Sequence, residues 1–236
     1  MTDRLVVIPC YNEAQNLTRL LPKLESVKPS AEIVFVNDGS TDNTREILEK
    51  EGHAVLTHEK NRGYSAAIRT GLSHALEKNY RYVCFMDSDG QHDPKYVPEA
   101  FAEAANVQPD LLIGSRFVQN TRYQGAASRR LGMIFFRWLV KTLTGKTVHD
   151  TTSGFKVFNR RAMNLALSEP CLKDFHAELI VYLLKEGCSV AEIPITVGQR
   201  QSGQSMYSWK DCVVYPFKTT RAVFGILSKK KASSPR

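Results

Sequence analysis

The chain has 236 residues, of which 42% are hydrophobic and 24% charged, a composition typical of a folded globular protein and not of a disordered one. Lys and Arg number 32 against 24 Asp and Glu, and the formal net charge of +8 indicates an anionic partner: nucleic acid, a phosphorylated substrate or an acidic membrane surface. The five cysteines show no paired or ligand-like spacing and fit a reducing cytoplasm, and we expect neither a signal peptide nor a membrane-spanning helix.

The first half of the chain alternates short apolar runs with helical patterns. Strands are predicted at residues 5–8, 33–36, 55–56 and 82–86. Helices are predicted at 14–25, through Arg45 to Leu48 with a cap at Ser40 or Thr41, and at 63–76. This strand–helix repeat predicts an α/β fold with a parallel sheet and right-handed crossovers.

Three of the predicted strands end in polar loops that carry acidic residues. The loops are PCYNE (9–13), NDGSTD (37–42) and DSDGQHD (87–93). In a parallel sheet these ends share one edge, where α/β folds place their ligand crevice. Glu13 and Asp38 could accept hydrogen bonds from the base or ribose of a nucleotide. For 38–40 alone, a turn followed by a helix cap explains the residues as well, and it is the convergence of three loops that favours a ligand site.

Asp87 and Asp89 follow the most apolar of these strands. Hard oxygen ligands so close together suit Mg²⁺ or Mn²⁺, particularly when substrate phosphates complete the coordination. An ordinary strand-to-turn exit is the alternative, because Asp and Gly also favour turns.

Several motifs in register resemble the family 2 glycosyltransferases, over about residues 4–205. They are PCYNE (9–13), VNDGSTD (36–42), NRGYSAAIRTG (61–71), DSDGQHDP (87–94) and GSRF (114–117). DTTSGF (150–155) and RQSGQS (200–205) make the chain similar to the dolichyl-phosphate mannosyltransferases and bacterial polyprenyl-phosphate sugar transferases. The resemblance implies a GT-A fold, in which a mainly parallel nucleotide-binding sheet is flanked by helices and extended by a mixed acceptor region.

The resemblance also implies roles for individual residues. Nucleotide contacts would come from Pro9, Tyr11, Glu13, Asp38 and Asp87, and Mg²⁺ or Mn²⁺ would be held by Asp89 and Gln91. The acceptor phosphate would be held by Arg116, Ser128, Arg129, Arg200 and Ser205, and the catalytic set would be Asp89, Asp150 and Arg116. Asn37 and Met206 depart from the family pattern, where an aspartate and a lysine are frequent.

The implied reaction moves a sugar from a UDP- or GDP-linked donor to a polyprenyl phosphate such as dolichyl or undecaprenyl phosphate. A metal would stabilise charge on the leaving diphosphate, and the ionised acceptor could attack without a general base and invert the anomeric centre. Arginines would offset the repulsion between phosphates. The alternative is a hydroxyl acceptor with Asp150 or Glu178 as base. The structural alternative is that Asp150 caps a turn and that Glu178 pairs with a nearby Arg or Lys.

Two stretches in the second half combine apolar stripes with basic residues. Residues 128–145 carry Ile134 and Trp138 in such a stripe, and 207–231 repeat the pattern before the triple lysine at 229–231. We expect interfacial helices on an anionic leaflet, so that the protein is cytoplasmic and peripherally bound, held by these segments or by a small membrane protein. For 128–145 a core helix is the alternative.

The expected organisation is a glycosyltransferase domain over 1–205, divided into a nucleotide-sugar half (1–115) and an acceptor half (116–205). A membrane-associating segment (206–231) and a disordered tail (232–236) follow. Nucleic acid is not an expected partner, because the basic residues accompany no nucleic-acid-binding motif. A nucleotide-binding regulator without catalysis is a further alternative.

Overall fold

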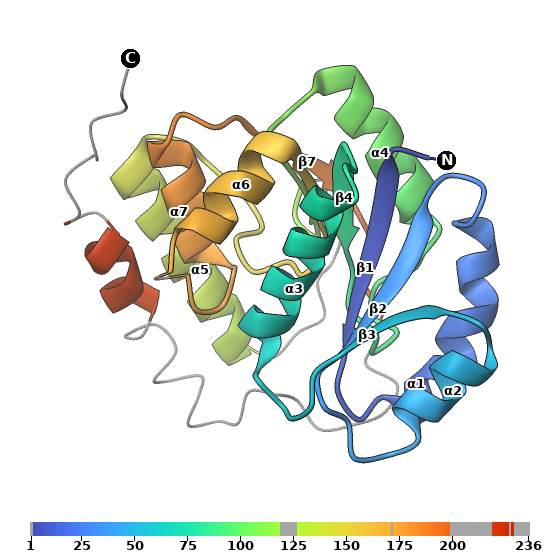
Figure 1. The fold of residues 1–236 in the computed structure, drawn as a ribbon. Coiled ribbons are helices and arrows are strands. Elements are labelled where there is room, and N and C mark those ends of the chain that lie inside the picture. The colour runs from blue at the N-terminus through green and yellow to red at the C-terminus, as the bar shows by residue number, and fades with distance from the viewer. Residues whose placement is uncertain (1, 119–126, 171, 199–218, 227, 229–236) are drawn as a thin grey trace.

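The computed structural model describes residues 2–118, 127–170, 172–198, 219–226 and 228, except for the side chains of 127–131. Within them a sheet of seven strands has the order β3-β2-β1-β4-β6-β5-β7. Figure 1 labels the strands β1 to β4 and β7, together with the helices around them. The strands are β1 (Arg4–Cys10), β2 (Glu32–Asn37), β3 (Ala54–Thr57), β4 (Tyr82–Phe85), β5 (Leu111–Ser115), β6 (Lys156–Asn159) and β7 (Val190–Pro194). The α-helices are α1 (Ala14–Leu20), α2 (Thr44–Lys50), α3 (Tyr64–Glu77), α4 (Tyr96–Val107), α5 (Ala127–Thr144), α6 (Arg160–Ser168) and α7 (Ala177–Lys185).

The predicted α/β class is confirmed, with one antiparallel strand in the sheet. Strands β3, β2, β1 and β4 pair in parallel, as do β5 and β7, whereas β6 runs antiparallel to both β4 and β5. The chain goes from β1 outward to β2 and β3 and then returns to place β4 on the other side of β1. This reversal makes the carboxyl ends of β1 and β4 the topological switch point, where open α/β sheets bind ligands.

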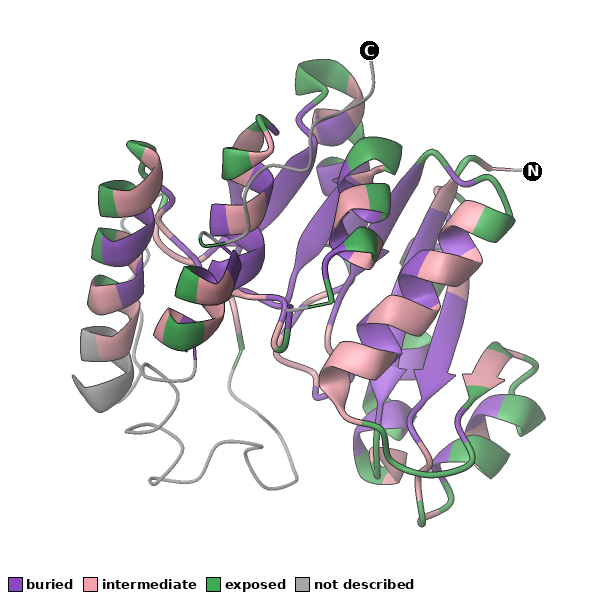
Figure 2. Cartoon of the chain, turned by 60° about the vertical axis from the view of Figure 1, so that its left-hand side comes forward, coloured by how far each residue is buried: buried purple, intermediate pink, exposed green. Residues whose placement is uncertain are grey.

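The sheet lies between two helical layers. Val7 of β1 belongs to the core that includes residues of α3, α5, α6 and α7, and its neighbour Ile8 belongs to the core that includes residues of α1, α2 and α4. Adjacent residues of a strand face opposite sides, so a strand buried on both faces reads as a continuous apolar run. Figure 2 shows the central strands as buried and the outward faces of the helices as exposed.

Two local predictions were wrong in detail. The helix expected at 14–25 is an α-helix over Ala14–Leu20 followed by a 3₁₀-helix over Leu21–Ser26. The change comes at Pro22, which has no N–H for the i→i−4 ladder. The second helix begins only at Thr44, because Ser40 and Thr41 bond instead to Asn12 of the neighbouring loop.

Helix α5 contributes to the core and also exposes apolar side chains. Phe136, Leu139 and Val140 are buried, whereas Ile134 and Trp138 are 60% and 59% exposed. Phe224, in the helical stretch 219–226, is 57% exposed. Among the residues described, no helix combines the length and apolarity needed to cross a bilayer.

Candidate active site

The three acidic loops meet at the carboxyl edge of the parallel strands. At the end of β1, the carbonyl of Cys10 accepts a hydrogen bond from the Asp38 N–H at 2.9 Å. The carbonyl of Pro9 accepts one from the Ser88 hydroxyl at 3.0 Å. The β1 loop is thus bonded on one side to the loop after β2 and on the other to the loop after β4. All three loops therefore border one region, at the switch point of the sheet.

The loop after β4 (residues 87–93, the acidic loop) is held in shape by its own side chains. One oxygen of Asp89 accepts the Gln91 N–H at 3.0 Å, and Asp89 is only 7% exposed. His92 accepts the Asp87 N–H at 3.1 Å through Nδ1. The Gln91 carboxamide donates to the carbonyl of Gly198 at 3.4 Å, so the chain that precedes residue 199 lies against this loop.

The acidic loop contains the oxygen donors that a divalent cation prefers. Among the described residues, no group of three or more His, Cys, Asp or Glu side chains is arranged to hold a metal. Such a donor set fits Mg²⁺ or Mn²⁺ bound by one or two protein groups together with substrate phosphates, and does not fit a closed protein cage.

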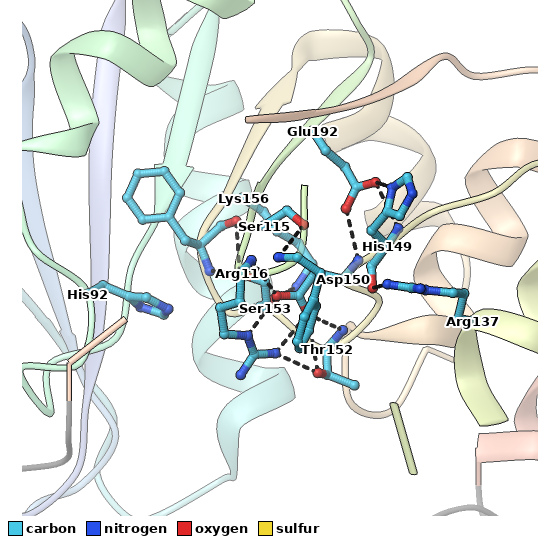
Figure 3. A network of polar contacts seen from close by, with 12 residues as sticks. His92, Ser115, Arg116, Arg137, His149, Asp150, Thr152, Ser153, Lys156 and Glu192 are labelled. Carbon is cyan, nitrogen blue, oxygen red and sulfur yellow. Dashed lines mark hydrogen bonds and ion pairs between the residues drawn. The ribbon is translucent and has the colours of Figure 1, made fainter. Parts of the chain in front are cut away.

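A second polar network lies beyond β4, around the loop 150–154 (Figure 3). Arg116, just after β5, makes a bidentate ion pair with Asp150, with Nε–Oδ2 and Nη2–Oδ1 distances of 2.7 Å each. Arg116 also donates from Nη2 to the Thr152 hydroxyl at 2.8 Å. Glu192 of β7 accepts the N–H groups of His149 and Asp150 and so fixes the start of the loop.

The ion pair decides the protonation state of Asp150. Burial acts to raise the pKa of this carboxyl, but the hydrogen bond and the charge of Arg116 outweigh it, and the pKa is lowered from its usual value. Asp150 is 1% exposed, and both of its oxygens bond to Arg116. A carboxylate held in this way orients the guanidinium and is poorly placed to act as a general base.

The loop 150–154 also reaches the acidic loop. A Cβ atom built on Gly154 would lie 2.4 Å from Oδ2 of Asp87, so only glycine fits there with the carboxylate in its present place. The same short loop therefore contacts Arg116 at one end and Asp87 at the other. The loop 150–154 therefore links the Arg116–Asp150 ion pair to the acidic loop.

Three buried ionisable groups lie behind this loop. Lys156 pairs opposite Phe85 in the sheet and donates through Nζ to the Ser153 carbonyl. Burial lowers the pKa of Lys156 to about 8, although the negative charges of Asp150 and Asp87 act to raise it. Burial and the positive charges of Lys156 and Arg116 lower the pKa of His176 to about 3, so this imidazole is neutral. Burial raises the pKa of Glu178, whose Oε1 accepts the Asp174 N–H at 2.8 Å.

Sequence reasoning missed Lys156, His176 and His58. Lys156 is the one basic residue of the apolar run FKVF, and a charge inside a predicted strand is the signal that could have drawn attention to it. For the histidines no such signal exists, because their partners are distant in sequence.

The predicted nucleotide contacts occupy different environments. Pro9 is buried within β1, while Tyr11 is 43% exposed. Glu13 accepts from the Asn16 side chain, and Asp38 is 4% exposed and bonded to the chain at 62–63. Asn37, where relatives often have aspartate, accepts the Ser40 N–H at 3.1 Å and so closes the turn after β2.

The predicted acceptor set is only partly described. Arg116 lies in the network above. The side chains of Ser128 and Arg129 and the residues Arg200 and Ser205 lie outside what the structure describes. Met206 and the segment 206–218 lie outside it as well.

Comparison with known proteins identifies the chain at the level of its family. Residues 5–165 match the model of the family described as Glycosyl transferase family 2. The chain belongs to glycosyl transferase family 2. The recognition from sequence motifs is confirmed, and the protein is a glycosyltransferase with the GT-A fold.

Relatives and solved structures resemble this glycosyltransferase over most of its length. Polyprenol monophosphomannose synthase of Mycolicibacterium smegmatis is 30% identical, over 86% of this chain and 80% of its own. Dolichyl-phosphate hexose transferase of Haloferax volcanii is 31% identical, over 84% of each chain. The structure of glucosyl-3-phosphoglycerate synthase from Mycobacterium tuberculosis, in complex with Mn²⁺, UDP and phosphoglyceric acid, superposes with a TM-score of 0.69. That similarity covers 97% of this chain and 80% of the other at 18% identity, and it supports the fold alone.

Proposed function

We propose that this glycosyltransferase transfers a sugar, with inversion, from a nucleoside diphosphate to a polyprenyl phosphate at the cytoplasmic face of a membrane. The observation that carries the proposal is the loop 150–154, which contacts Arg116 at one end and Asp87 at the other. An anionic acceptor bound near Arg116 and a donor bound near the acidic loop would then lie at the two ends of this one short loop. The names of the two relatives, which refer to polyprenol and dolichyl phosphates, support the acceptor class.

The donor is assigned to the switch point of the sheet. Pro9, Tyr11, Glu13, Asp38 and Asp87 would contact its nucleotide, UDP- or GDP-linked. Asp89 and Gln91 would hold Mg²⁺ or Mn²⁺, and the bound ion would neutralise charge on the leaving diphosphate. The structurally similar synthase is in complex with Mn²⁺ and UDP, which supports the proposed classes of metal and donor.

A phosphate acceptor is favoured over a hydroxyl because neither candidate base has a suitable environment. Asp150 is bonded through both oxygens to Arg116. Glu178 is 1% exposed and bonded to the chain at Asp174. A phosphate monoester is already ionised near neutral pH and needs positive charge to approach the donor, which Arg116, Arg129 and Arg200 would supply. The hydroxyls of Ser128 and Ser205 would add hydrogen bonds to the same phosphate. In this assignment Asp150 is a positioning residue for Arg116.

Membrane contact is assigned to the amphipathic second half. Ile134, Trp138 and Phe224 present apolar surface to solvent, which supports a peripheral association of α5 and the segment 206–231 with a lipid surface. The triple lysine would strengthen the attraction to anionic lipids, and a small membrane protein could hold the enzyme in addition. The proposal keeps the expected organisation of the chain: a nucleotide-sugar half that ends at 115, an acceptor half that ends at 205, a membrane-associating segment that ends at 231, and a disordered tail at 232–236.

The proposed reaction is tested by direct assay. The protein is incubated with UDP- and GDP-sugars, Mn²⁺ and a polyprenyl phosphate, and glycolipid is detected by mass spectrometry. We expect a polyprenyl phosphate sugar from the phosphate and none from the matched polyprenol, because only the phosphate brings its own charged nucleophile. Glycosylation of the polyprenol in preference to the phosphate would contradict the acceptor assignment.

The contact between Gly154 and Asp87 gives a milder prediction. Gly154→Ala forces the Asp87 carboxylate off its rotamer, and we expect kcat/KM for the donor to fall about tenfold, equivalent to about 1.4 kcal/mol, with little loss of fold. Gly132→Ala in α5 is the control, because its Cβ would meet no described atom within 4 Å. Equal kinetics for the two variants would show that the position of Asp87 is not critical.

A further inference from the structure

His58 connects three elements at the nucleotide end of the sheet. It follows β3, and its backbone N–H donates to the Asn37 carbonyl of β2 at 2.9 Å. Its ring lies between two partners, with Nδ1 at 2.6 Å from Oδ1 of Asp38 and Nε2 at 2.9 Å from the Thr70 hydroxyl of α3. His58 is 8% exposed, so this Asp38–His58–Thr70 relay is shielded from water.

The first partner, Asp38, holds the segment that leads into α3. Its Oδ1 accepts the Arg62 N–H at 2.9 Å and its Oδ2 accepts the Gly63 N–H at 2.8 Å. The neighbouring Gly39 packs backbone to backbone against Lys60, and at a φ of +68° no Cβ is accommodated there. The segment 60–63 is therefore docked on the end of β2 through one carboxylate and one close backbone contact.

The relay determines how that carboxylate is oriented. A carboxylate rotates readily about its Cβ–Cγ bond, and its two peptide N–H partners come from one short segment of chain. The ring of His58 is fixed in its orientation, because its Nε2 is bonded to Thr70, which lies on the long helix α3. A neutral imidazole satisfies both contacts when Nδ1–H donates to Asp38 and the Thr70 hydroxyl donates to Nε2. Partners of this kind fix the direction of a functional group without touching its ligand.

We propose that His58 is a positioning residue for the nucleoside diphosphate part of the donor. Through Asp38 it sets the segment 60–63, which borders the switch point because Asp38 is also bonded to Cys10 of the β1 loop. The inference rests on the proposed function for the identity of this ligand. Arg116 and the loop 150–154 lie on the other side of β4, so the effect of the relay is confined to the donor.

The test compares four single variants in the full-length protein. His58→Phe removes both ring contacts, and we expect it to raise the donor KM and the Kd for UDP or GDP with Mn²⁺ about tenfold, with the acceptor KM unchanged. Thr70→Val removes one of the two ring contacts and should weaken donor binding less than His58→Phe does. Thr70→Ser keeps the hydroxyl and should give wild-type values of the donor KM and the nucleotide Kd. His74→Phe, one turn further along α3, is the matched control and should leave donor binding unchanged.

Calorimetry of nucleotide binding keeps this inference separate from the acceptor assignment. If the wild type binds the nucleotide but forms no polyprenyl glycolipid, the proposed acceptor fails, and the ratio of Kd values between variants still decides the role of His58. Unchanged Kd values in folded His58→Phe and Thr70→Val would overturn the inference. A lower Tm and kcat with unchanged donor KM would also overturn it, since the relay would then serve stability alone. Should His58→Phe fail to fold, the Thr70→Val and Thr70→Ser pair gives the same decision.

Discussion

Replacement of Asp89 by asparagine is expected to lower kcat/KM for sugar transfer by about a thousandfold, because a metal contributes several kcal/mol to the stabilisation of charge on a phosphate leaving group. The substitution removes the negative charge but keeps an oxygen that can accept the Gln91 N–H, so the acidic loop retains its shape. Initial rates measured over a titration of Mn²⁺ would show whether the loss lies in metal use.

Asp93→Asn is the matched control for Asp89→Asn. Asp93 lies four residues further on, with a side chain that is 40% exposed and paired with Lys95 at 3.4 Å. We expect its rates and Mn²⁺ dependence to equal those of the wild type. Full activity of Asp89→Asn at ordinary Mn²⁺ concentrations would contradict the metal assignment.

Replacement of Arg116 by methionine is the second change with a large expected effect. It leaves Asp150, 1% exposed, without its counter-charge, and breaking such a buried pair costs about 3–5 kcal/mol in the free energy of unfolding. Denaturant unfolding followed by circular dichroism measures this loss. Sugar transfer to the polyprenyl phosphate should be lost as well, because the cation proposed to hold the acceptor is gone.

The double variant Arg116→Met with Asp150→Asn separates folding from function. Removing both charges leaves neither member of this pair buried without its partner, so we expect most of the stability to return while transfer stays undetectable. Recovery of transfer in the double variant would show that Arg116 serves the fold and does not bind the acceptor.

The same pair predicts part of the acid dependence of stability. The pKa of Asp150 is lowered in the folded protein, so its contribution is complete above the ordinary carboxyl pKa and is lost as the pH falls through the lowered folded value. In the double variant this portion of the acid dependence should be absent from the unfolding free energy measured against pH.

Much of the nucleotide half could be predicted from local features. Strand β4 is buried on both faces, and a run such as Tyr82–Phe85 shows this directly by its apolarity. The loops at 9–13, 37–42 and 87–93 could be placed because turn residues act locally and parallel strands share one carboxyl edge. The family motifs added the expected roles of the residues in those loops.

The acceptor half could not be predicted at the same level, because its contacts join distant residues. Arg116 and Asp150 are 34 residues apart, and no periodicity indicates that they pair. The antiparallel insertion of β6 between β4 and β5 brings Gly154 against Asp87, and strand pairing of this kind depends on the whole sheet. The same holds for His58, whose partners Asp38 and Thr70 come from two other elements.

The sequence alone determined that this protein has an α/β fold with acidic residues at one edge of its sheet, because apolar strands and turn chemistry are local properties of the chain. The glycosyltransferase assignment came from the resemblance of its motifs to the family. Only the tertiary structure decided which charges are paired, which carboxylates are engaged in hydrogen bonds, and at which glycine a side chain would not fit. Those outcomes depend on the side chains that folding brings within hydrogen-bond distance, and the chain order does not contain that information in any local pattern.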